Sequence, residues 1–187
     1  NGYVFIGLDH FAKPNDELAV ARANKTLHRN FQGYTTKSDC DLFGFGITSI
    51  SNIQNTFSQN IKKINPYYES IEKNETPLFR GFVLNQDDIL RKEVIMRILC
   101  HGEVDKKEIE KEFNINFDDY FAYEMDKLKE YEDEGLIERT ASCEPRAAIK
   151  ITDLGQLFLR NIASTFDYYL QETKRKNEKE KLYSKSV

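Results

Sequence analysis

Seven consecutive residues, from His28 to Tyr34, combine several side chains that commonly bind small molecules. Arg29 could hold a carboxylate through two parallel hydrogen bonds, and Gln32 carries both donors and an acceptor for a polar ligand. Phe31 and Tyr34 offer ring faces on which a flat group can stack. A tight turn built on the asparagine and the glycine of the same stretch is the alternative. The density of these groups favours a ligand site over a purely structural turn.

A second pair of polar residues, Asp9 and His10, follows a short apolar run at residues 4–8. If that run is a buried strand, the pair lies in the loop at its end, where α/β domains place groups that contact ligands. The two side chains could then act as a base and the group that orients it, or bind a polar substrate. The alternative is a structural loop in which Asp9 accepts hydrogen bonds from backbone amides. Pattern alone favours this alternative.

Two glycines, Gly44 and Gly46, interrupt an apolar stretch at 42–47 that predicts a buried strand. The nucleotide-binding pattern GxGxxG is not completed, because residue 49 is a serine. Glycines in a strand allow the close approach of a backbone or a ligand, so Ile50 could form part of an apolar floor under an adenine ring. Ordinary core packing is the alternative, and the pattern alone favours it.

The first 80 residues predict the end of an α/β region followed by a connection. A buried strand at 4–8 precedes a helix that begins at 14–17, where acidic residues in the first turn are favoured by the helix dipole. A second buried strand follows at 42–47. Residues 51–80 are polar and mixed, and isoleucines and a tyrosine at helical spacing predict a helix over about 58–72.

Residues 81–170 have a different pattern, in which helices surround two short strands. The expected elements are helices at 87–101, 106–113 and 117–134, strands at 137–140 and 148–151 around the turn Glu144-Pro145-Arg146, and a last helix capped by Thr152-Asp153. Three helices, a hairpin and a closing helix is the order of a winged-helix domain. From Gln171 onward nearly every residue is charged or polar, and we expect a helix extension that frays into a disordered tail.

Charge argues against nucleic acid as a partner. The third helix would be the one that enters the major groove of DNA, but residues 118–134 hold eight acidic residues and two lysines. A helix of that sign would face phosphates of the same sign. The whole chain has a net charge of −4, which gives no general attraction to nucleic acid or to an anionic membrane. No apolar run approaches the roughly 20 residues that span a bilayer.

The three cysteines, Cys40, Cys100 and Cys143, are widely separated and form no CxxC pair. An odd number at such spacing argues against disulfides and against a self-contained zinc or iron–sulfur site. We therefore expect reduced thiols in a cytoplasmic protein, and no metal site within this chain.

Four stretches together closely resemble the oxygen-independent coproporphyrinogen III oxidases, which are radical S-adenosylmethionine enzymes of haem biosynthesis. They are, in chain order, IGLDHFA at 6–12, DELA at 16–19, HRNFQGYTT at 28–36 and DLFGFG at 41–46. The resemblance covers nearly all of residues 1–170, and RNFQGYTT is its most specific string. It implies an α+β fold with the end of a partial (β/α) radical-SAM barrel at 1–55, a connector at 56–80, a mostly helical, winged-helix-like C-terminal domain at 81–170 and a charged tail at 171–187.

The resemblance also implies an activity, the oxidative decarboxylation of two propionate side chains of coproporphyrinogen III to vinyl groups, which gives protoporphyrinogen IX. In the family a 4Fe–4S cluster splits S-adenosylmethionine, and the resulting 5′-deoxyadenosyl radical removes a hydrogen from the propionate. Members bind two S-adenosylmethionine molecules. By the match, Ile50 contacts the cluster-bound molecule, while Phe31 and Gln32 lie beside the second one. Arg29 and Tyr34 are our own candidates for substrate binding.

One departure from the family is large: its cluster motif, CxxxCxC, does not occur in this chain. We therefore assign no catalytic residue and no metal ligand here, and we interpret the chain as a C-terminal fragment. Its partner would be the missing N-terminal barrel half of the same protein, and the fragment alone should be inactive. Exposed strand edges of a divided barrel would favour self-association. The alternative is a non-catalytic module that binds S-adenosylmethionine or a porphyrin.

Overall fold

The computed structural model describes residues 1–38, 40–140 and 147–183, with side chains described as far as residue 176. The turn expected at 144–146 and the residue Cys143 lie outside this description. The chain forms two compact units, unit 1 from Asn1–Thr36 together with Leu90–Val187, and unit 2 from Lys37–Ile89. Helices and strands occur in both units, which confirms the expected mixed α and β class. The domain limits expected near residues 55 and 80 stay a prediction.

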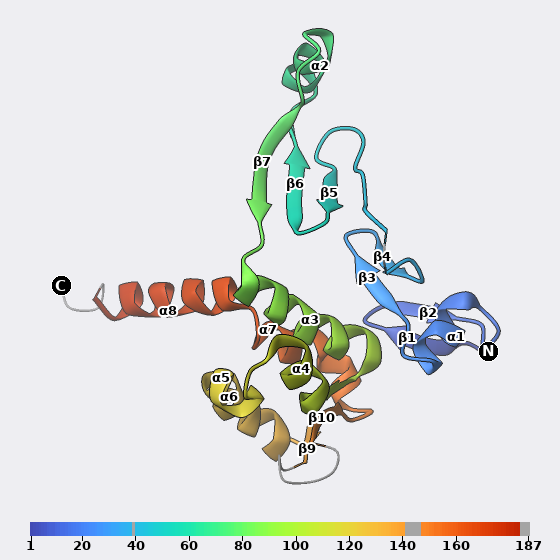
Figure 1. The fold of residues 1–187 in the computed structure, drawn as a ribbon, viewed down its shortest axis with the longest axis vertical. Helices are drawn as coiled ribbons and strands as arrows, with labels where there is room; N and C mark the ends of the chain where they lie inside the picture. Colours follow the sequence, from blue (N-terminus) through green and yellow to red (C-terminus); the bar gives the residue numbers. More distant parts are fainter. Residues whose placement is uncertain (39, 141–146, 184–187) are drawn as a thin grey trace. The chain divides into compact units, whose positions relative to one another are not determined.

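The N-terminal segment of unit 1 consists of two short antiparallel hairpins and one helix (Figure 1). Its elements are β1 Val4–Gly7, β2 His10–Ala12, α1 Glu17–Ala23, β3 His28–Asn30 and β4 Gly33–Thr35. The carboxylate of Asp16 accepts a hydrogen bond from the Leu18 amide at 2.9 Å, so α1 begins where the sequence predicts. A small apolar core joins these elements to α3, with the buried members Ile6, Ala12, Ala21, Leu27, Tyr34 and Cys100.

The rest of unit 1 packs helices against a three-stranded antiparallel sheet (Figure 1). Its elements are α3 Gln86–His101, which begins in unit 2, then β8 Glu103–Asp105, α4 Lys106–Phe113, α5 Phe117–Tyr120, α6 Ala122–Asp133, β9 Ile137–Arg139, β10 Ala148–Ile151, η1 Gly155–Phe158, α7 Leu159–Ser164 and α8 Tyr168–Tyr183. The strand order is β8-β10-β9. The strands expected at 137–140 and 148–151 are confirmed, whereas β8 was not expected. The winged-helix assignment stays a prediction.

Local residues explain where α3 and α4 begin and where α4 ends. Asn85 and Asp88 cap α3 reciprocally, because the Asp88 amide donates to Asn85 Oδ1 (2.9 Å) and the Asn85 amide donates to Asp88 Oδ2 (3.0 Å). Asp105 accepts from two amides of the first turn of α4. Asn114, with φ +53°, ends α4 in the left-handed region. Both helices therefore match the sequence prediction closely.

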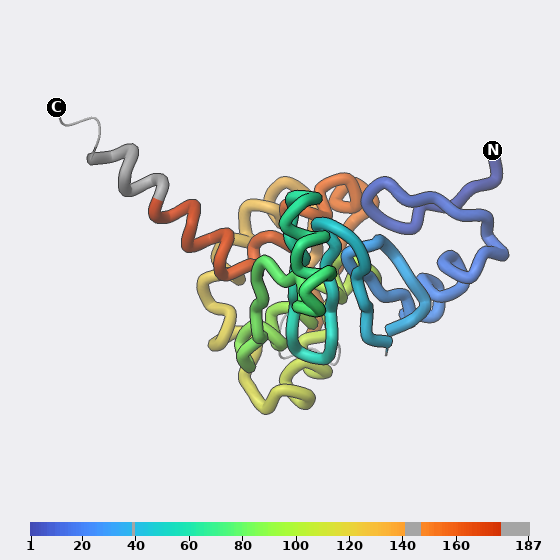
Figure 2. Tube along the Cα trace, turned by 90° about the horizontal axis from the view of Figure 1, so that it is seen from above, coloured from blue at the N-terminus to red at the C-terminus, as the bar shows by residue number. Residues whose placement is uncertain are grey.

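Two expected helices are interrupted in the structure. The helix expected over 117–134 is two helices, α5 and α6, that meet at Phe121, a fully buried residue. The last expected helix is divided into η1, α7 and α8. Thr152 caps its start as predicted, since its hydroxyl oxygen accepts from the Gly155 amide at 3.0 Å. The helical extension expected after residue 171 is present, because α8 continues to Tyr183. Figure 2 draws the first turns of this helix in red.

Unit 2 is a three-stranded antiparallel sheet with a helix inserted between its last two strands. Its elements are β5 Ile50–Ile53, β6 Thr56–Asn60, α2 Ile64–Glu72 and β7 Leu78–Val83. The helix expected over 58–72 begins only at Ile64, because residues 56–60 pair with both neighbouring strands.

The buried strand expected at 42–47 is wrong. Only Leu42 pairs, through an isolated bridge to Asn52, and Phe45 is 90% exposed. Gly46, with φ +93°, lies at a bend, and its carbonyl oxygen accepts a hydrogen bond from the Asn60 side chain instead of pairing in a strand.

Candidate functional site

The stretch 28–34 forms a hairpin whose tip carries the two residues expected to touch a cofactor. Phe31 is 54% exposed at the turn between β3 and β4, and Gln32 beside it is exposed as well. The Asn30 side chain accepts a hydrogen bond from the Gln32 amide at 2.8 Å, and Gly33 adopts φ +133°. The tight turn that was the structural alternative is therefore present, and it exposes the Phe31 and Gln32 side chains to solvent.

Tyr34 points into the small core of unit 1. Its hydroxyl donates to the carbonyl oxygen of Leu99 at 2.9 Å, and the His10 ring meets it edge-on at 5.1 Å between centroids. Burial, and secondarily the nearby Cys100, raises the pKa of Tyr34 to about 12. A Cβ on Gly7 would lie 2.1 Å from the same hydroxyl, so only glycine fits there. The Tyr34 hydroxyl is thus engaged in holding the hairpin to α3, and its role toward a substrate stays a prediction.

Arg29 lies opposite Tyr34 in the hairpin and crosses its ring, with the guanidinium carbon 5.6 Å from the ring centroid. Its Nε is buried and has no hydrogen-bond partner within the described part of the chain. The side chain lines an open depression of about 430 Å³ on unit 1. The lining residues are Leu8, Arg29, Ile95, Leu99, Arg160, Ala163, Ser164 and Asp167.

Arg160, on the exposed side of α7, is a residue that the sequence analysis missed. It lines this depression and a neighbouring one that Leu8 and Asp9 also border. No local pattern around residue 160 suggests a ligand site. Only the folded chain brings α7 and β3 to the same depression.

Asp9 and His10 lie close to each other, as their spacing predicts. His10 Nδ1 is 3.0 Å from Asp9 Oδ1, but the angle does not make a hydrogen bond, so Nδ1 remains unpartnered among the described residues. Asp9 is exposed, whereas the His10 ring packs against Tyr34. The packing of His10 agrees with the structural alternative for this pair, while Asp9 faces the depression shared with Arg160.

Ile50 opens β5 in unit 2, where it pairs with Gln59 of β6 and is partly buried. The loop before it is held by Asn60, whose amide nitrogen donates to the Gly46 carbonyl (3.0 Å) and to the Ser49 hydroxyl (3.0 Å). Gly44 approaches the Ile50 backbone so closely that a Cβ would lie 2.8 Å from its carbonyl oxygen. The close approach expected of these glycines therefore occurs at Gly44, toward backbone, whereas no atom lies within 4 Å of a Cβ built on Gly46.

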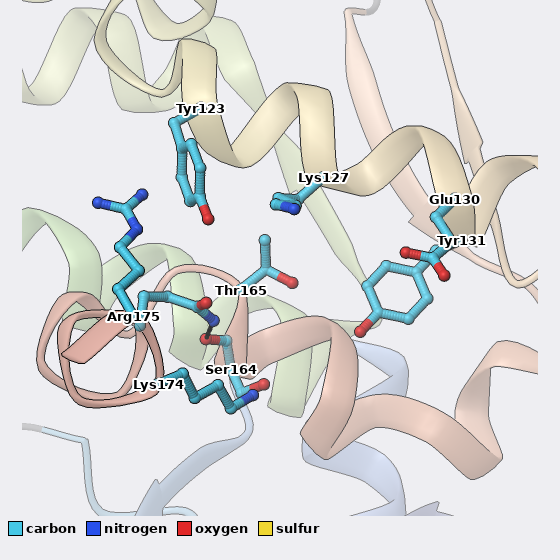
Figure 3. Close-up of a pocket in the computed structure, with 9 residues that line it drawn as sticks. Tyr123, Lys127, Glu130, Tyr131, Ser164, Thr165, Lys174 and Arg175 are labelled. Carbon is cyan, nitrogen blue, oxygen red and sulfur yellow. Dashed lines mark hydrogen bonds between the residues drawn. The ribbon is translucent and has the colours of Figure 1, made fainter. Parts of the chain in front are cut away.

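A third depression, between α6, α7 and α8, is lined by polar side chains (Figure 3). Arg175 stacks on Tyr123, with its guanidinium carbon 4.1 Å from the ring centroid. Gln171 Nε2 donates to the Ser164 carbonyl at 2.8 Å. These contacts fasten α8 to the two other helices, so we interpret this depression as a feature of helix packing.

The described residues contain no group of three or more histidine, cysteine, aspartate or glutamate side chains that could hold a metal ion. Cys40 is exposed and Cys100 is buried. Burial raises the pKa of the Cys100 thiol to about 12, which disfavours the thiolate that a metal would need. In the same part of the chain, every helix is too short or too polar to cross a lipid bilayer.

Comparisons of the sequence and of the structure with known proteins point to the same family of enzymes. Residues 84–158 match the family model described as the HemN C-terminal domain. The oxygen-independent coproporphyrinogen III oxidase of Synechocystis sp. is 43% identical over 190 residues, which cover 100% of this chain and 39% of that protein. The enzyme of the same name from Escherichia coli is 42% identical and covers 94% of this chain and 37% of its own length.

A solved structure is similar as well. It is described as "Coproporphyrinogen III oxidase (HemN) from Escherichia coli is a Radical SAM enzyme", and it matches with a TM-score of 0.83 at 42% identity. The match covers 90% of this chain and 38% of the other. The chain therefore spans about two fifths of the length of these relatives.

Proposed function

We propose that this chain forms the C-terminal part of an oxygen-independent coproporphyrinogen III oxidase, because relatives of that name match 94–100% of it at 42–43% identity. The match of residues 84–158 to the HemN C-terminal domain carries the proposal, and it falls within the domain expected at 81–170. The parent enzyme would convert two propionate side chains of coproporphyrinogen III to vinyl groups with loss of carbon dioxide. The N-terminal part of the same protein would be the partner of this chain.

S-adenosylmethionine is the cofactor that we propose for the parent, since the related Escherichia coli protein is described as a radical SAM enzyme. When bound, it would supply the radical that removes a hydrogen atom from the propionate. Phe31 and Gln32, exposed at the β3–β4 turn, can offer it a ring face and an amide. Ile50 can offer an apolar contact. The Asn30 side chain holds the turn and so orients both cofactor contacts at its tip.

The residues that the structure describes do not fit an iron–sulfur cluster. Cluster binding needs several cysteine thiolates in one place, and the two described cysteines differ in burial and form no metal-binding group. The cluster ligands would therefore belong to the N-terminal part of the parent. We expect this chain alone to be inactive, and its contribution to be the positioning of cofactor and substrate.

The proposal is tested with the full-length parent protein, its cluster loaded, in an anaerobic assay with S-adenosylmethionine, a reductant and coproporphyrinogen III. We expect protoporphyrinogen IX, with one carbon dioxide released for each vinyl group formed. A parent that cleaves S-adenosylmethionine but leaves coproporphyrinogen III unchanged would contradict the proposed substrate.

Gln32→Ala tests the proposed cofactor contact in the same assay. We expect turnover to fall about 10-fold or more, since a hydrogen bond to a charged ligand contributes about 1.5 kcal/mol or more, while the cluster absorption stays unchanged. Gln86→Ala, at the exposed start of α3, is the matched control and should leave turnover as it is. Normal turnover of the Gln32 variant would remove this residue from the site.

A further inference from the structure

We propose that the depression between the β3–β4 hairpin and α7 is a carboxylate site, in which Arg29 and Arg160 together bind one propionate group of the substrate. This inference rests on the proposed function, because it takes coproporphyrinogen III as the ligand. It adds Arg160, which no sequence motif identifies, to the candidate Arg29, and it assigns a binding position to one propionate group.

Two elements far apart in the sequence supply the two positive charges. Arg29 comes from the middle of β3, and Arg160 from the second position of α7. Both line the same depression of unit 1. Arg29 is held in place by the Tyr34 ring that it crosses, and Tyr34 is itself fixed by its hydrogen bond to Leu99. One guanidinium is therefore positioned before any ligand arrives, while the exposed Arg160 side chain can adjust to it.

Both arginines lack an ion pair within the described part of the chain. Arg29 Nε is in addition buried without an acceptor among the described residues, and a buried donor left unpaired is unfavourable. Asp167, the acid that also lines the depression, accepts a hydrogen bond from the Leu170 amide at the start of α8. The site therefore offers donors to an anion, and a carboxylate is the group whose two oxygens suit a guanidinium.

The walls of the depression distinguish a propionate arm from a small inorganic anion. Leu8, Ile95, Leu99 and Ala163 give it an apolar lining beside the two guanidinium groups. A propionate side chain carries its carboxylate on two methylene groups, so its apolar part can lie on this lining while its charge meets the arginines. A free phosphate or sulfate would leave the apolar lining uncovered.

The experiment uses the full-length parent protein with Arg29→Gln, Arg160→Gln and Arg160→Glu, and with Arg175→Gln as the control. Arg175 is an arginine on α8 that stacks on Tyr123 outside this depression. The readouts are KM and kcat for coproporphyrinogen III and the affinity for two fluorescent probes, the tetraacid coproporphyrin III and its uncharged tetramethyl ester. We expect each Gln variant to raise KM and weaken tetraacid binding about 10-fold, with a larger loss for Arg160→Glu. Ester binding and the control should be unchanged.

The outcomes separate this inference from the proposed function. If the wild-type parent does not convert coproporphyrinogen III, the proposed function fails. If it does, and KM and tetraacid binding stay unchanged in Arg160→Gln and Arg160→Glu, the carboxylate site is wrong. If Arg29→Gln and Arg160→Gln lower only the melting temperature and leave KM and tetraacid binding unchanged, the two arginines have a structural role, and the inference is overturned as well. Because Arg160 is exposed, its variants should fold normally.

Discussion

Tyr34 and Cys100 are two titratable side chains that folding moves into the same small core. Burial raises the pKa of Tyr34 from 10.0 to about 12, and that of Cys100 from 9.0 to about 12. Each group is neutral in the fold and ionises more easily when unfolded. The stability that their burial allows is therefore fully present below the unfolded pKa values and is lost as the pH rises toward the folded ones.

We accordingly expect the free energy of unfolding to be constant near neutral pH and to fall as the pH rises from about 9 toward 12. Urea denaturation at several pH values measures this slope. Cys100→Ala and Tyr34→Phe should each make it shallower, and Tyr34→Phe should also lower stability at neutral pH by about 1 kcal/mol through the lost hydrogen bond. A slope that neither variant alters would mean that other groups titrate with unfolding.

Arg91 and Glu124 form an ion pair that is largely buried, so its effect on stability can be measured. The two atoms are 2.7 Å apart, and the side chains are 13% and 8% exposed. Glu124→Ala removes a charged hydrogen-bond acceptor of the buried Arg91 guanidinium, so it should lower the free energy of unfolding by about 2 kcal/mol. The exposed pair of Lys129 and Asp126 is the control, and Asp126→Ala should leave the denaturation midpoint almost unchanged. Equal effects from the two variants would contradict this difference.

At the scale of elements, the sequence predicts best where a helix carries its own start and stop signals. The bounds of α4 agree with the expectation of 106–113, because Asp105 caps its start and Asn114 ends it locally. The strand predicted at 42–47 is wrong, and the helix predicted over 58–72 is wrong in its first part, because long-range strand pairing determines the conformation of these stretches. Residues 56–60 form β6, which pairs with both β5 and β7. The side-chain amide of Asn60 donates a hydrogen bond to the Gly46 carbonyl and so holds the loop before β5.

The candidate site divides in the same way. Arg29, Phe31 and Gln32 lie within one short hairpin, so a dense run of side chains that could bind a ligand identifies them in the sequence as candidates. Arg160 enters through the packing of α7 beside that hairpin, and nothing in its neighbourhood signals this. Sequence alone therefore offers the candidate residues that are contiguous in the chain, and it misses those that only the tertiary fold brings to them.

Gly155, at the start of η1, packs so closely against neighbouring residues that no side chain fits there. A Cβ there would lie 1.9 Å from the Leu136 carbonyl oxygen and 2.9 Å from Ile151 Cγ2. Gly155→Ala should therefore separate η1 from β9 and β10 and lower the free energy of unfolding by about 3 kcal/mol. Gly135→Ala is the control, since its φ of +70° costs only about 1–2 kcal/mol and no atom obstructs the new Cβ. Thermal unfolding followed by circular dichroism compares the two, and a smaller loss for Gly155→Ala would refute this packing.

The whole chain leaves much apolar surface uncovered in unit 2. The four apolar side chains with the clearest exposure on β7 are Leu78 at 49%, Phe79 at 57%, Phe82 at 43% and Val83 at 72%. Among the described strands, β7 pairs only with β6, so its other edge carries free backbone groups. The chain also spans only about two fifths of the length of its relatives. An uncovered apolar strand edge of this kind is a surface on which further chain packs.

We therefore expect the isolated 187-residue chain to self-associate as its concentration rises, through pairing of β7 edges. Sedimentation velocity over a range of concentrations measures the apparent mass. Val83→Lys should shift association to concentrations about 10-fold higher or more, because a charged side chain at an edge opposes pairing and apolar burial. Leu154→Lys, at a 52% exposed leucine of unit 1, is the control and should leave association unchanged. A chain that stays monomeric throughout, or equal shifts in both variants, would show that β7 is not the surface of contact.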